Sequence, residues 1–269
     1  MTPRATHAVV SLAALDVRRA PDHRAELGSQ LLLGEVVRLG RGSAGGRWLE
    51  VTGEDGYSGW ARSWGLVRVT AARAARWRAQ AKARVCAALT QAHAGPRGRG
   101  ALVSPLFLNS RLIAGRARAG HVPVELPDGR RGFVPVRALA GRRTSPPRLV
   151  DRVRSLLGVP YMWGGRTPAA FDCSGFTQQV LAEQGIAIPR DARHQYRDAT
   201  PLPRGETPAP GDLIFFANPD EPVGHVGLGL GGEWFAHCRG RVRINSADPD
   251  NILCDNELQP TIRGWRRPH

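Results

Sequence analysis

Cysteine, lysine and long apolar runs are scarce in this sequence of 269 residues, and each scarcity excludes a class of protein. The four cysteines, at positions 86, 173, 238 and 254, are too few and too unevenly spaced for a disulfide framework. No apolar stretch approaches the length of a membrane span, and Asp16 closes the short apolar run near the start without a cleavage-site pattern. We therefore expect a cytoplasmic protein with reduced thiols, no signal peptide and no membrane partner.

Acidic residues are also few, because 38 Lys and Arg face 23 Asp and Glu, which gives a formal charge of +15. Such a balance attracts anions, including nucleic acid and acidic small molecules. Lys82 is the single lysine, and this preference for arginine indicates a bias of genome composition rather than a phosphate-binding surface. Nucleic acid is therefore not expected as a partner.

Two segments repeat one pattern, EDGYSGWARSWGL at 54–66 and PDGRRGFVPVRAL at 127–139. Each follows short β-like runs, and Asp-Gly between such runs is typical of a hairpin, since glycine supplies the positive φ of a tight turn. We expect two small β-barrels, over 1–70 and 96–142. The Ala- and Arg-rich stretch at 71–95, which stops at a Gly-Pro pair, predicts a connecting helix.

The C-terminal part, 149–269, follows a Thr-Ser-Pro-Pro linker at 144–147. A short amphipathic helix is predicted at 149–158, and a second helix within FDCSGFTQQVLAEQG at 171–185. PAPGDLIFF, VGHVGLGL, EWFAHC and RVRINS follow as strand candidates. A helix followed by consecutive strands predicts an α+β domain with a mostly antiparallel sheet.

The position of Cys173 in the sequence favours a nucleophilic thiolate. Asp172 is a good N-cap residue, which puts Cys173 at the first position of a helix. Backbone N–H groups and the helix dipole stabilise a thiolate there, so we expect a lowered thiol pKa. Cys173 is therefore the candidate nucleophile, and its own N–H is a candidate oxyanion donor.

His225 and His237 are candidate partners on neighbouring strands. If Gly231–Glu233 form a three-residue loop, Leu230 pairs with Trp234 and both imidazoles lie on one face of the sheet. A two-residue loop would put them on opposite faces. The first arrangement predicts a Cys–His–His relay, in which His225 takes the thiol proton and His237 orients it.

Zinc is the rival interpretation, because Cys173, His225, His237 and Cys238 are all ligand types. No C-x-x-C or H-x-x-x-H spacing is present, however, and neighbouring strand residues 237 and 238 point to opposite faces. We expect neither a metal nor another cofactor.

The order PYMWGG, FDCSGF, PRDARHQ, PGDLIFF and GHVGLGLGGEWFAHC resembles the NlpC-type cysteine peptidases of bacterial cell-wall metabolism, which have a papain-like fold. The resemblance covers about 149–269 and implies the same roles for Cys173, His225 and His237. It also implies that Tyr161 lines the pocket of the nucleophile. The two N-terminal segments resemble bacterial SH3-like domains, the first of them those of cytoplasmic dipeptidyl-peptidase VI-type relatives.

This resemblance implies hydrolysis of the γ-D-glutamyl–diamino acid bond in peptidoglycan-derived stem peptides with a free N-terminal L-Ala, as in cell-wall peptide recycling. The pocket for the free amine is expected to combine Asp172 and Ser174 with Tyr57 from the first barrel, and Glu26 is a weaker candidate. The second barrel has Arg130 in place of the tyrosine, which predicts a spacer.

Arg190 and Asp191 are expected on a loop that can touch the carboxylates of the substrate. Two other functions stay open from the sequence: an amidase or acyltransferase with the same triad, and a non-catalytic protein that binds the cell wall. The sequence also leaves open the identity of the diamino acid, the oligomeric state, export of the chain and the role of His194.

Overall fold

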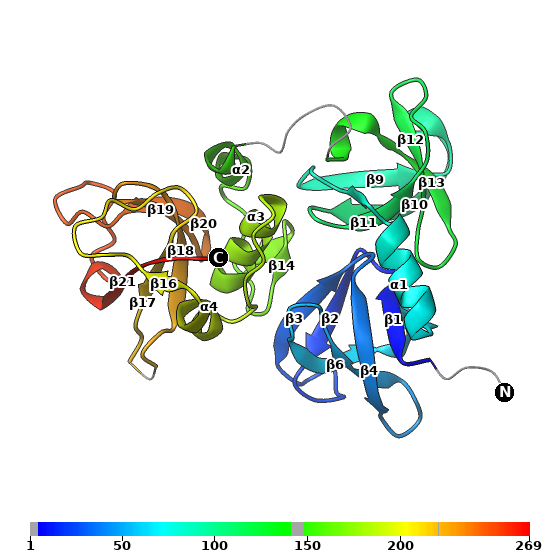
Figure 1. Cartoon of the computed structure of the whole chain (residues 1–269), viewed down its shortest axis with the longest axis horizontal. Coiled ribbons are helices and arrows are strands. Elements are labelled where there is room, and N and C mark those ends of the chain that lie inside the picture. The colour runs from blue at the N-terminus through cyan, green and yellow to red at the C-terminus, as the bar shows by residue number, and fades with distance from the viewer. Residues whose placement is uncertain (1–4, 141–147, 220) are drawn as a thin grey trace. The chain divides into compact units, whose positions relative to one another are not determined.

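The structure is a computed structural model, and it describes residues 5–140, 148–219 and 221–269. The chain divides into two compact units, Met1–Pro146 and Pro147–His269, and each is described by itself (Figure 1). Both α and β elements are present, as the sequence predicts. The linker predicted at 144–147 lies outside the described residues.

The first unit opens with a seven-stranded antiparallel sheet. Alternating apolar residues such as Leu15 and Val17 turn inward and form its core, as a half-buried strand requires. In spatial order the strands are β3 (Leu27–Leu32), β2 (Ala14–Arg18), β6 (Ser58–Arg62), β5 (Trp48–Thr52), β4 (Val36–Gly42), β1 (His7–Val10) and β7 (Leu66–Val69), with the 3-10 turn η1 (Ser63–Gly65) before β7.

A second, six-stranded antiparallel sheet completes this unit. Leu106, Leu112 and Val122 lie in its core, together with Leu33, the residue after β3. The strands are β10 (Leu102–Phe107), β9 (Leu89–His93), β13 (Arg131–Pro135), β12 (His121–Glu125), β11 (Arg111–Ala114) and β8 (Ala83–Arg84), with the 3-10 turns η2 (Pro96–Gly98) and η3 (Val136–Ala138).

Both sequence repeats form the predicted hairpin turns. Gly56 and Gly129 have φ of 80° and 85°, the left-handed region that the Asp-Gly pair indicates. Arg130, which replaces Tyr57 in the second repeat, donates to the carbonyl oxygen of Val103 at 2.6 Å and to that of Ser11 at 2.9 Å. Arg130 thus ties the second sheet to the loop after β1 in the first.

The helix predicted at 71–95 is wrong beyond Gln80. Helix α1 spans Ala71–Gln80, with Thr70 as its N-cap, and β8 and β9 of the second sheet lie in the remainder. From Ala81 the burial alternates along Ala-Lys-Ala-Arg-Val, which is the period of a strand. This alternation outweighs the helix propensity of the alanines and arginines.

The second unit is built on a six-stranded antiparallel sheet, as predicted. Its strands are β16 (Thr200–Pro201), β21 (Ile262–Arg267), β17 (Leu213–Phe216), β18 (His225–Gly231), β19 (Trp234–Arg239) and β20 (Arg241–Ser246). The remaining elements are α2 (Leu149–Ser155), the ribbon of β14 (Arg166–Thr167) and β15 (Ala170–Phe171), α3 (Cys173–Glu183), α4 (Ala192–Asp198) and the 3-10 turn η4 (Gln259–Thr261). The strand β21 was not predicted.

Helix α3 is the rigid element that positions Cys173. Its residues 173–181 are all buried, and it packs against β18 and β19. Arg152 of α2 clamps its far end through two hydrogen bonds of 2.6 Å to the Glu183 carboxylate, and both side chains are less than a tenth exposed. A helix held at both ends and along its length keeps its first residue in place.

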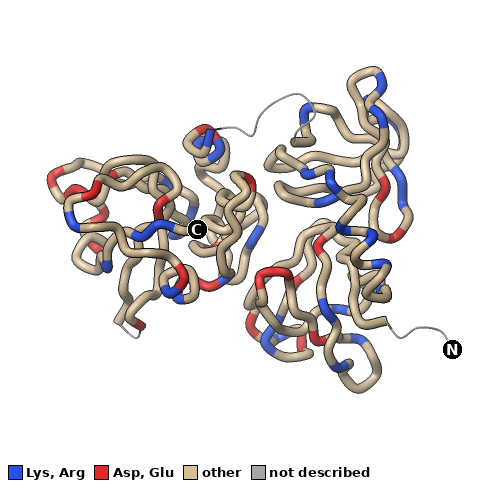
Figure 2. Tube along the Cα trace, in the orientation of Figure 1, with Lys and Arg blue, Asp and Glu red and all other residues tan. Residues whose placement is uncertain are grey.

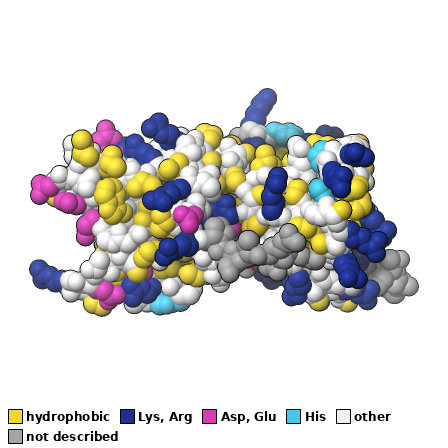
Figure 3. Space-filling view, turned by 90° about the horizontal axis from the view of Figure 1, so that it is seen from above, with side chains coloured by type: hydrophobic (Ala, Val, Ile, Leu, Met, Phe, Trp, Pro, Cys, Tyr) yellow, Lys and Arg dark blue, Asp and Glu magenta, His cyan; other side chains and the backbone are white. Residues whose placement is uncertain are grey.

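The positive charge of the chain is spread over both units. Lys and Arg recur along the whole trace in Figure 2, interspersed with Asp and Glu. On the face drawn in Figure 3 they stand singly among hydrophobic and neutral side chains. Among the described residues, no helix has the length and apolar character needed to cross a membrane.

Candidate active site

Asp172 caps α3 and sets the place of Cys173, as the sequence predicts. Its carboxylate accepts hydrogen bonds from the backbone N–H of Gly175 at 2.6 Å and of Gly164 at 2.9 Å. Cys173 is the first residue of the helix and is 9% exposed. Gly175 is needed here, because a Cβ at that position would lie 2.2 Å from the carbonyl oxygen of Gly165.

Arg190 is inside the protein and holds this helix start together. Its guanidinium forms an ion pair of 2.5 Å with the Asp172 carboxylate and donates to the Ser174 hydroxyl at 2.8 Å. Only 2% of Arg190 is exposed. The prediction that it contacts substrate carboxylates from an open loop is therefore wrong, and the charge of Asp172, expected to face a substrate ammonium, is already balanced by Arg190.

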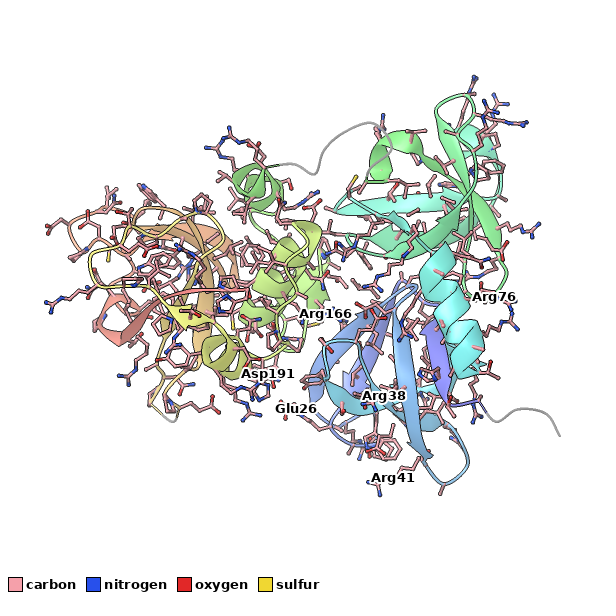
Figure 4. The ribbon with its side chains drawn as sticks, viewed as in Figure 1. Glu26, Arg38, Arg41, Arg76, Arg166 and Asp191 are labelled. Atoms are coloured by element: carbon pink, nitrogen blue, oxygen red, sulfur yellow. The ribbon has the colours of Figure 1, made fainter. Side chains whose placement is uncertain are left out.

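Asp191 remains at the surface, at the N-cap position of α4 (Figure 4). Its carboxylate lies 3.9 Å from both the Arg193 guanidinium and the His194 imidazole. His194 is thus a half-exposed residue next to Asp191, and it is not one of the buried residues around Cys173.

The hairpin of β18 and β19 brings the two histidines to one face by a route that differs from the predicted one. Gly231, not Leu230, pairs with Trp234, so only Gly232 and Glu233 form the loop. A register shift follows between Gly229 and Gly231, which makes Leu230 the extra residue of a β-bulge. The bulge restores the register that a two-residue loop alone would have shifted by one.

The imidazoles of His225 and His237 are in direct contact. His225 Nε2 and His237 Nδ1 are 2.7 Å apart, and the rings meet edge to face with centroids 5.0 Å apart. His237 is fully buried. The bond to His237 engages Nε2 of His225 and leaves its Nδ1 for another partner.

Two further residues, which the sequence analysis did not identify, contact His237. Asn245 Oδ1 lies 3.0 Å and Arg243 Nε 3.1 Å from His237 Nε2. Both belong to β20, where Arg243 pairs directly with His237, so the three side chains share one face of the hairpin. RVRINS is a strand candidate in the sequence, and extending the pairing across the turn after Cys238 and Arg239 would have found them.

The sulfur of Cys173 lies beside β18. The backbone N–H of Val226, the residue after His225, hydrogen-bonds to it, and so does that of Ser174. Burial above all, and the Asp172 carboxylate with it, nevertheless raise the pKa of the Cys173 thiol to about 12, against the backbone bonds and Arg190. The lowered pKa expected from the helix start is therefore wrong for the free protein, because desolvation of the thiolate outweighs it.

Burial also keeps both imidazoles neutral. It lowers the pKa of His225 well below 6.5, and the neighbouring His237, Arg239 and Arg243 lower it further. Burial lowers the pKa of His237 to about 4, against the bond to Asn245. The thiol and both imidazoles are therefore neutral at pH 7.

Tyr161 lies at the edge of this group. Burial raises the pKa of its phenol, and the nearby Cys173 and Asp172 raise it further. Together with His225 it lines a cavity of about 760 Å³. The cavity also reaches Arg239, Glu257 and Arg263 and extends along the ends of β17, β18 and β21.

The two residues predicted for the amine pocket from the N-terminal part belong to the first unit. Glu26 precedes β3 (Figure 4). Tyr57 follows the first Asp-Gly turn, its ring packs under the Arg19 guanidinium at 5.4 Å, and its hydroxyl fills the space beside Gly28. A Cβ at position 28 would lie 2.2 Å from that oxygen, so this glycine makes room for the phenol.

Comparison with known proteins identifies two segments. Residues 158–257 match the model of the NlpC/P60 family, and residues 17–66 match the model of the bacterial dipeptidyl-peptidase SH3 domain. These matches confirm the resemblance that the sequence motifs indicate.

Curated relatives match part of the chain. The γ-D-glutamyl-L-lysine dipeptidyl-peptidase of Bacillus subtilis is 42% identical over 83 residues, which cover 30% of this chain and 28% of the relative. The enzyme of the same name from Bacillus cereus is 41% identical over 86 residues, 31% of this chain and 25% of the relative. The probable endopeptidase p60 of Listeria grayi is 42% identical over 84 residues, 31% and 16% of the two chains. The chain thus spans less than a third of the length of these relatives.

Two solved structures share the fold over most of the chain. An NlpC/P60 family protein from Bacillus cereus superposes with a TM-score of 0.81 at 21% identity, over 97% of this chain and 99% of the other. An NlpC/P60 endopeptidase from Photobacterium damselae subsp. piscicida superposes with a TM-score of 0.68 at 16% identity, over 91% and 66% of the two chains.

Proposed function

Because the chain carries an NlpC/P60 cysteine-peptidase domain preceded by a bacterial dipeptidyl-peptidase SH3 domain, we propose that it hydrolyses the γ-D-glutamyl–diamino acid bond of peptidoglycan stem peptides. The relatives from Bacillus subtilis and Bacillus cereus, whose names state a γ-D-glutamyl-L-lysine dipeptidyl-peptidase, support this bond as the target. We further propose that both N-terminal sheets are SH3-like barrels and that the second unit is papain-like.

The observation that carries the proposal is the pair of contacting imidazoles together with a buried cysteine at a helix start beside the same strand. Cys173 begins a buried helix, its sulfur lies beside the backbone of Val226, and His225 stands 2.7 Å from His237. A nucleophile, a neutral base and a residue that orients the base are the three parts that covalent catalysis of acyl transfer needs.

The reaction follows from these positions. As the sulfur attacks the γ-carbonyl carbon, the thiol proton passes to Nδ1 of His225, and the backbone N–H of Cys173 is the candidate donor to the oxyanion. Collapse of the tetrahedral intermediate breaks the C–N bond, and His225 returns its proton to the leaving amine. Water then hydrolyses the thioester with His225 as the base, which releases the γ-D-glutamyl product and restores the thiol.

We propose that the substrate carries a free N-terminal L-Ala and that Tyr57 and Glu26 recognise its ammonium group. An aromatic ring and a carboxylate suit an ammonium ion, and the space beside Gly28 fixes the place of the phenol. Asp172 and Ser174 contribute through the start of α3, where Arg190 holds both. We place the activity in the cytoplasm, in the recycling of cell-wall peptides, since the four cysteines are free thiols.

The test is mass spectrometry of the tripeptide L-Ala-γ-D-Glu-diamino acid after incubation with the protein. Wild type is expected to release L-Ala-γ-D-Glu, and Cys173→Ala to release none. Cys254→Ala is the matched control, because it removes another free thiol of the same unit. Cleavage that survives in Cys173→Ala would refute the nucleophile.

The same assay tests the amine. Acetylation of the N-terminal L-Ala should abolish release by wild type. Tyr57→Phe is expected to raise KM for the free tripeptide but not to lower kcat, because the hydroxyl takes no part in the proton transfers of the proposed reaction. Equal cleavage of acetylated and free tripeptide would exclude a requirement for the amine.

A further inference from the structure

His237 Nε2 has two hydrogen-bonding neighbours, one of which needs it as a donor and the other as an acceptor. Asn245 Oδ1, at 3.0 Å, is a hydrogen-bond acceptor, and Arg243 Nε, at 3.1 Å, is a donor. A ring nitrogen of neutral imidazole either carries a hydrogen and donates, or has a lone pair and accepts. Only one of the two neighbours can therefore be satisfied at a time.

The structure shows which neighbour prevails. The amide nitrogen of Asn245 donates to the carbonyl oxygen of Leu253 at 2.7 Å, and this bond turns Oδ1 toward the imidazole. Flipping the amide would lose the bond to Leu253, because two oxygens would then face each other. Arg243 has another partner, because its Nη2 forms a 2.5 Å ion pair with the Asp255 carboxylate, and it does not depend on the lone pair of His237.

We propose that Asn245 is a positioning residue that sets the tautomers of both histidines. With the hydrogen on His237 Nε2, the lone pair at Nδ1 accepts the N–H of His225 Nε2 across 2.7 Å. His225 Nδ1 is then bare and is the nitrogen left to receive the thiol proton. The inference rests on the proposed role of His225 as the base.

The opposite state is inactive although no residue moves. If Arg243 donates to His237 Nε2, the hydrogen of His237 sits on Nδ1 and is donated to His225 Nε2. His225 then carries its own hydrogen on Nδ1, where it cannot accept another. Removing Asn245 leaves Arg243 as the remaining neighbour of Nε2 and therefore favours this state.

Steady-state kinetics of tripeptide cleavage test the idea. Asn245→Leu is expected to lower kcat about 10- to 100-fold, the usual effect of losing an orienting partner, with KM unchanged. Asn245→Asp, which still accepts from Nε2, should lose less. The double variant Asn245→Leu/Arg243→Leu should regain part of the lost kcat, because the donor that favours the inactive tautomer is gone. Asn256→Leu, at an exposed position near Asn245 in the sequence, is the control.

Imidazole ¹⁵N NMR reads the tautomers without activity. Wild type should show both histidines protonated at Nε2, and Asn245→Leu should show both protonated at Nδ1. Identical tautomers in the two proteins, or no recovery in the double variant, would overturn the proposal and leave Asn245 with a structural role. A wild type that fails to cleave the tripeptide would refute the proposed function instead, while the NMR result still decides the tautomers.

The cavity next to His225 carries a second, independent inference. Three charged side chains line it: Arg239, Arg263 and Glu257. Arg239 is engaged by Glu257 at 2.6 Å and by Asp255 at 3.3 Å. Arg263 is exposed, and no ion pair joins it to a carboxylate within the described part of the chain. The cavity therefore offers one cation that is not neutralised.

The position of the cavity beside His225 indicates which part of the substrate would occupy it. His225 lines the cavity and must pass its proton to the leaving amine, so the released residue lies against His225. We infer that Arg263 binds a carboxylate of the leaving diamino acid, an inference that rests on the proposed function. Two carboxylates qualify, the α-carboxylate at the end of the peptide and the side-chain carboxylate of diaminopimelate.

Three substrates separate these sources: L-Ala-γ-D-Glu followed by lysine, by lysinamide or by diaminopimelate. Arg263→Gln should raise KM about tenfold for each substrate whose carboxylate the arginine binds, as expected for loss of a charged hydrogen bond. Arg154→Gln, an exposed arginine on α2, is the control.

An effect on lysine that is absent with lysinamide assigns the α-carboxylate, and an effect confined to diaminopimelate assigns the side chain. An equal effect on all three, or none on any, overturns the inference. If wild type cleaves none of the three, the proposed function fails instead.

Discussion

At the scale of single residues, burial decides the protonation states around Cys173. The thiol has the backbone donors that favour a thiolate, yet it is 9% exposed and its pKa is raised to about 12. The same exclusion of water lowers the pKa of His225. Proton transfer during attack, rather than a preformed ion pair, is what these two shifts favour.

The pH dependence of kcat/KM follows from the lowered pKa of His225. A base must be neutral to accept a proton, so activity is lost as the pH falls through its pKa, and a lowered pKa moves that loss below pH 6.5. Tripeptide cleavage measured from pH 4 to 8 should therefore stay constant from pH 8 down to pH 6.5, and any loss should begin below that pH. An acid limb centred at or above pH 6.5 would contradict this assignment.

Arg190→Met is expected to destabilise the second unit by about 3–5 kcal/mol, because it leaves the Asp172 carboxylate buried without its counter-charge. Arg193→Met, at an exposed position three residues further along the chain, should change stability by less than about 0.5 kcal/mol. Chemical denaturation of each variant measures the difference. A loss of activity in Arg190→Met without loss of stability would show that the guanidinium meets the substrate after all.

At the scale of elements, the β-bulge at Leu230 matters as much as the histidines it aligns. Side chains alternate along a strand, so one residue more or less moves His225 to the other face of the sheet. The two-residue loop and the extra residue Leu230 act together, and only their combination brings His225 to His237.

Deleting Leu230 should therefore reduce tripeptide cleavage to the level of Cys173→Ala while the unit stays folded. Leu230→Ala keeps the residue count and should retain activity within a few-fold, which makes it the matched control. Circular dichroism checks folding, and the cleavage assay reads the effect. Full activity in the deletion variant would mean that the hairpin restores its register in another way.

At the scale of the whole molecule, the buried histidines couple stability to pH. The pKa of His237 is lowered from 6.5 to about 4, so the unfolded chain binds a proton that the folded one does not. Stability is complete above pH 6.5 and is lost as the pH falls toward 4, by about 3 kcal/mol for this histidine.

Hydrogen exchange of peptides from β18 and β19 measures this loss. Protection, corrected for intrinsic exchange, should fall between pH 7 and pH 5 in wild type and fall less in His237→Asn. His194→Asn, which removes a half-exposed histidine of the same unit, should behave as wild type. Equal losses in wild type and His237→Asn would assign the pH dependence to other groups.

Local patterns in the sequence were sufficient for the parts of the fold that depend on neighbouring residues. The Asp172 cap, the hairpin turns at Gly56 and Gly129 and the antiparallel strands around both histidines follow from turn chemistry, capping and periodicity. The same reasoning failed at 81–95, where helix propensity conflicted with a strand period that only the packing of the second sheet decided.

The sequence by itself determined where the sulfur stands, because an N-cap and a helix start are properties of a few adjacent residues. Only the tertiary structure decided the charge states and partners of the site, since these depend on what excludes water and on segments far apart in the chain. Arg190 reaches Asp172 from beyond the end of α3, and Asn245 reaches His237 from β20. No local pattern encodes such contacts. The burial that comes with them sets the pKa values of the Cys173 thiol and the His225 imidazole, and so decides which of the two carries the proton.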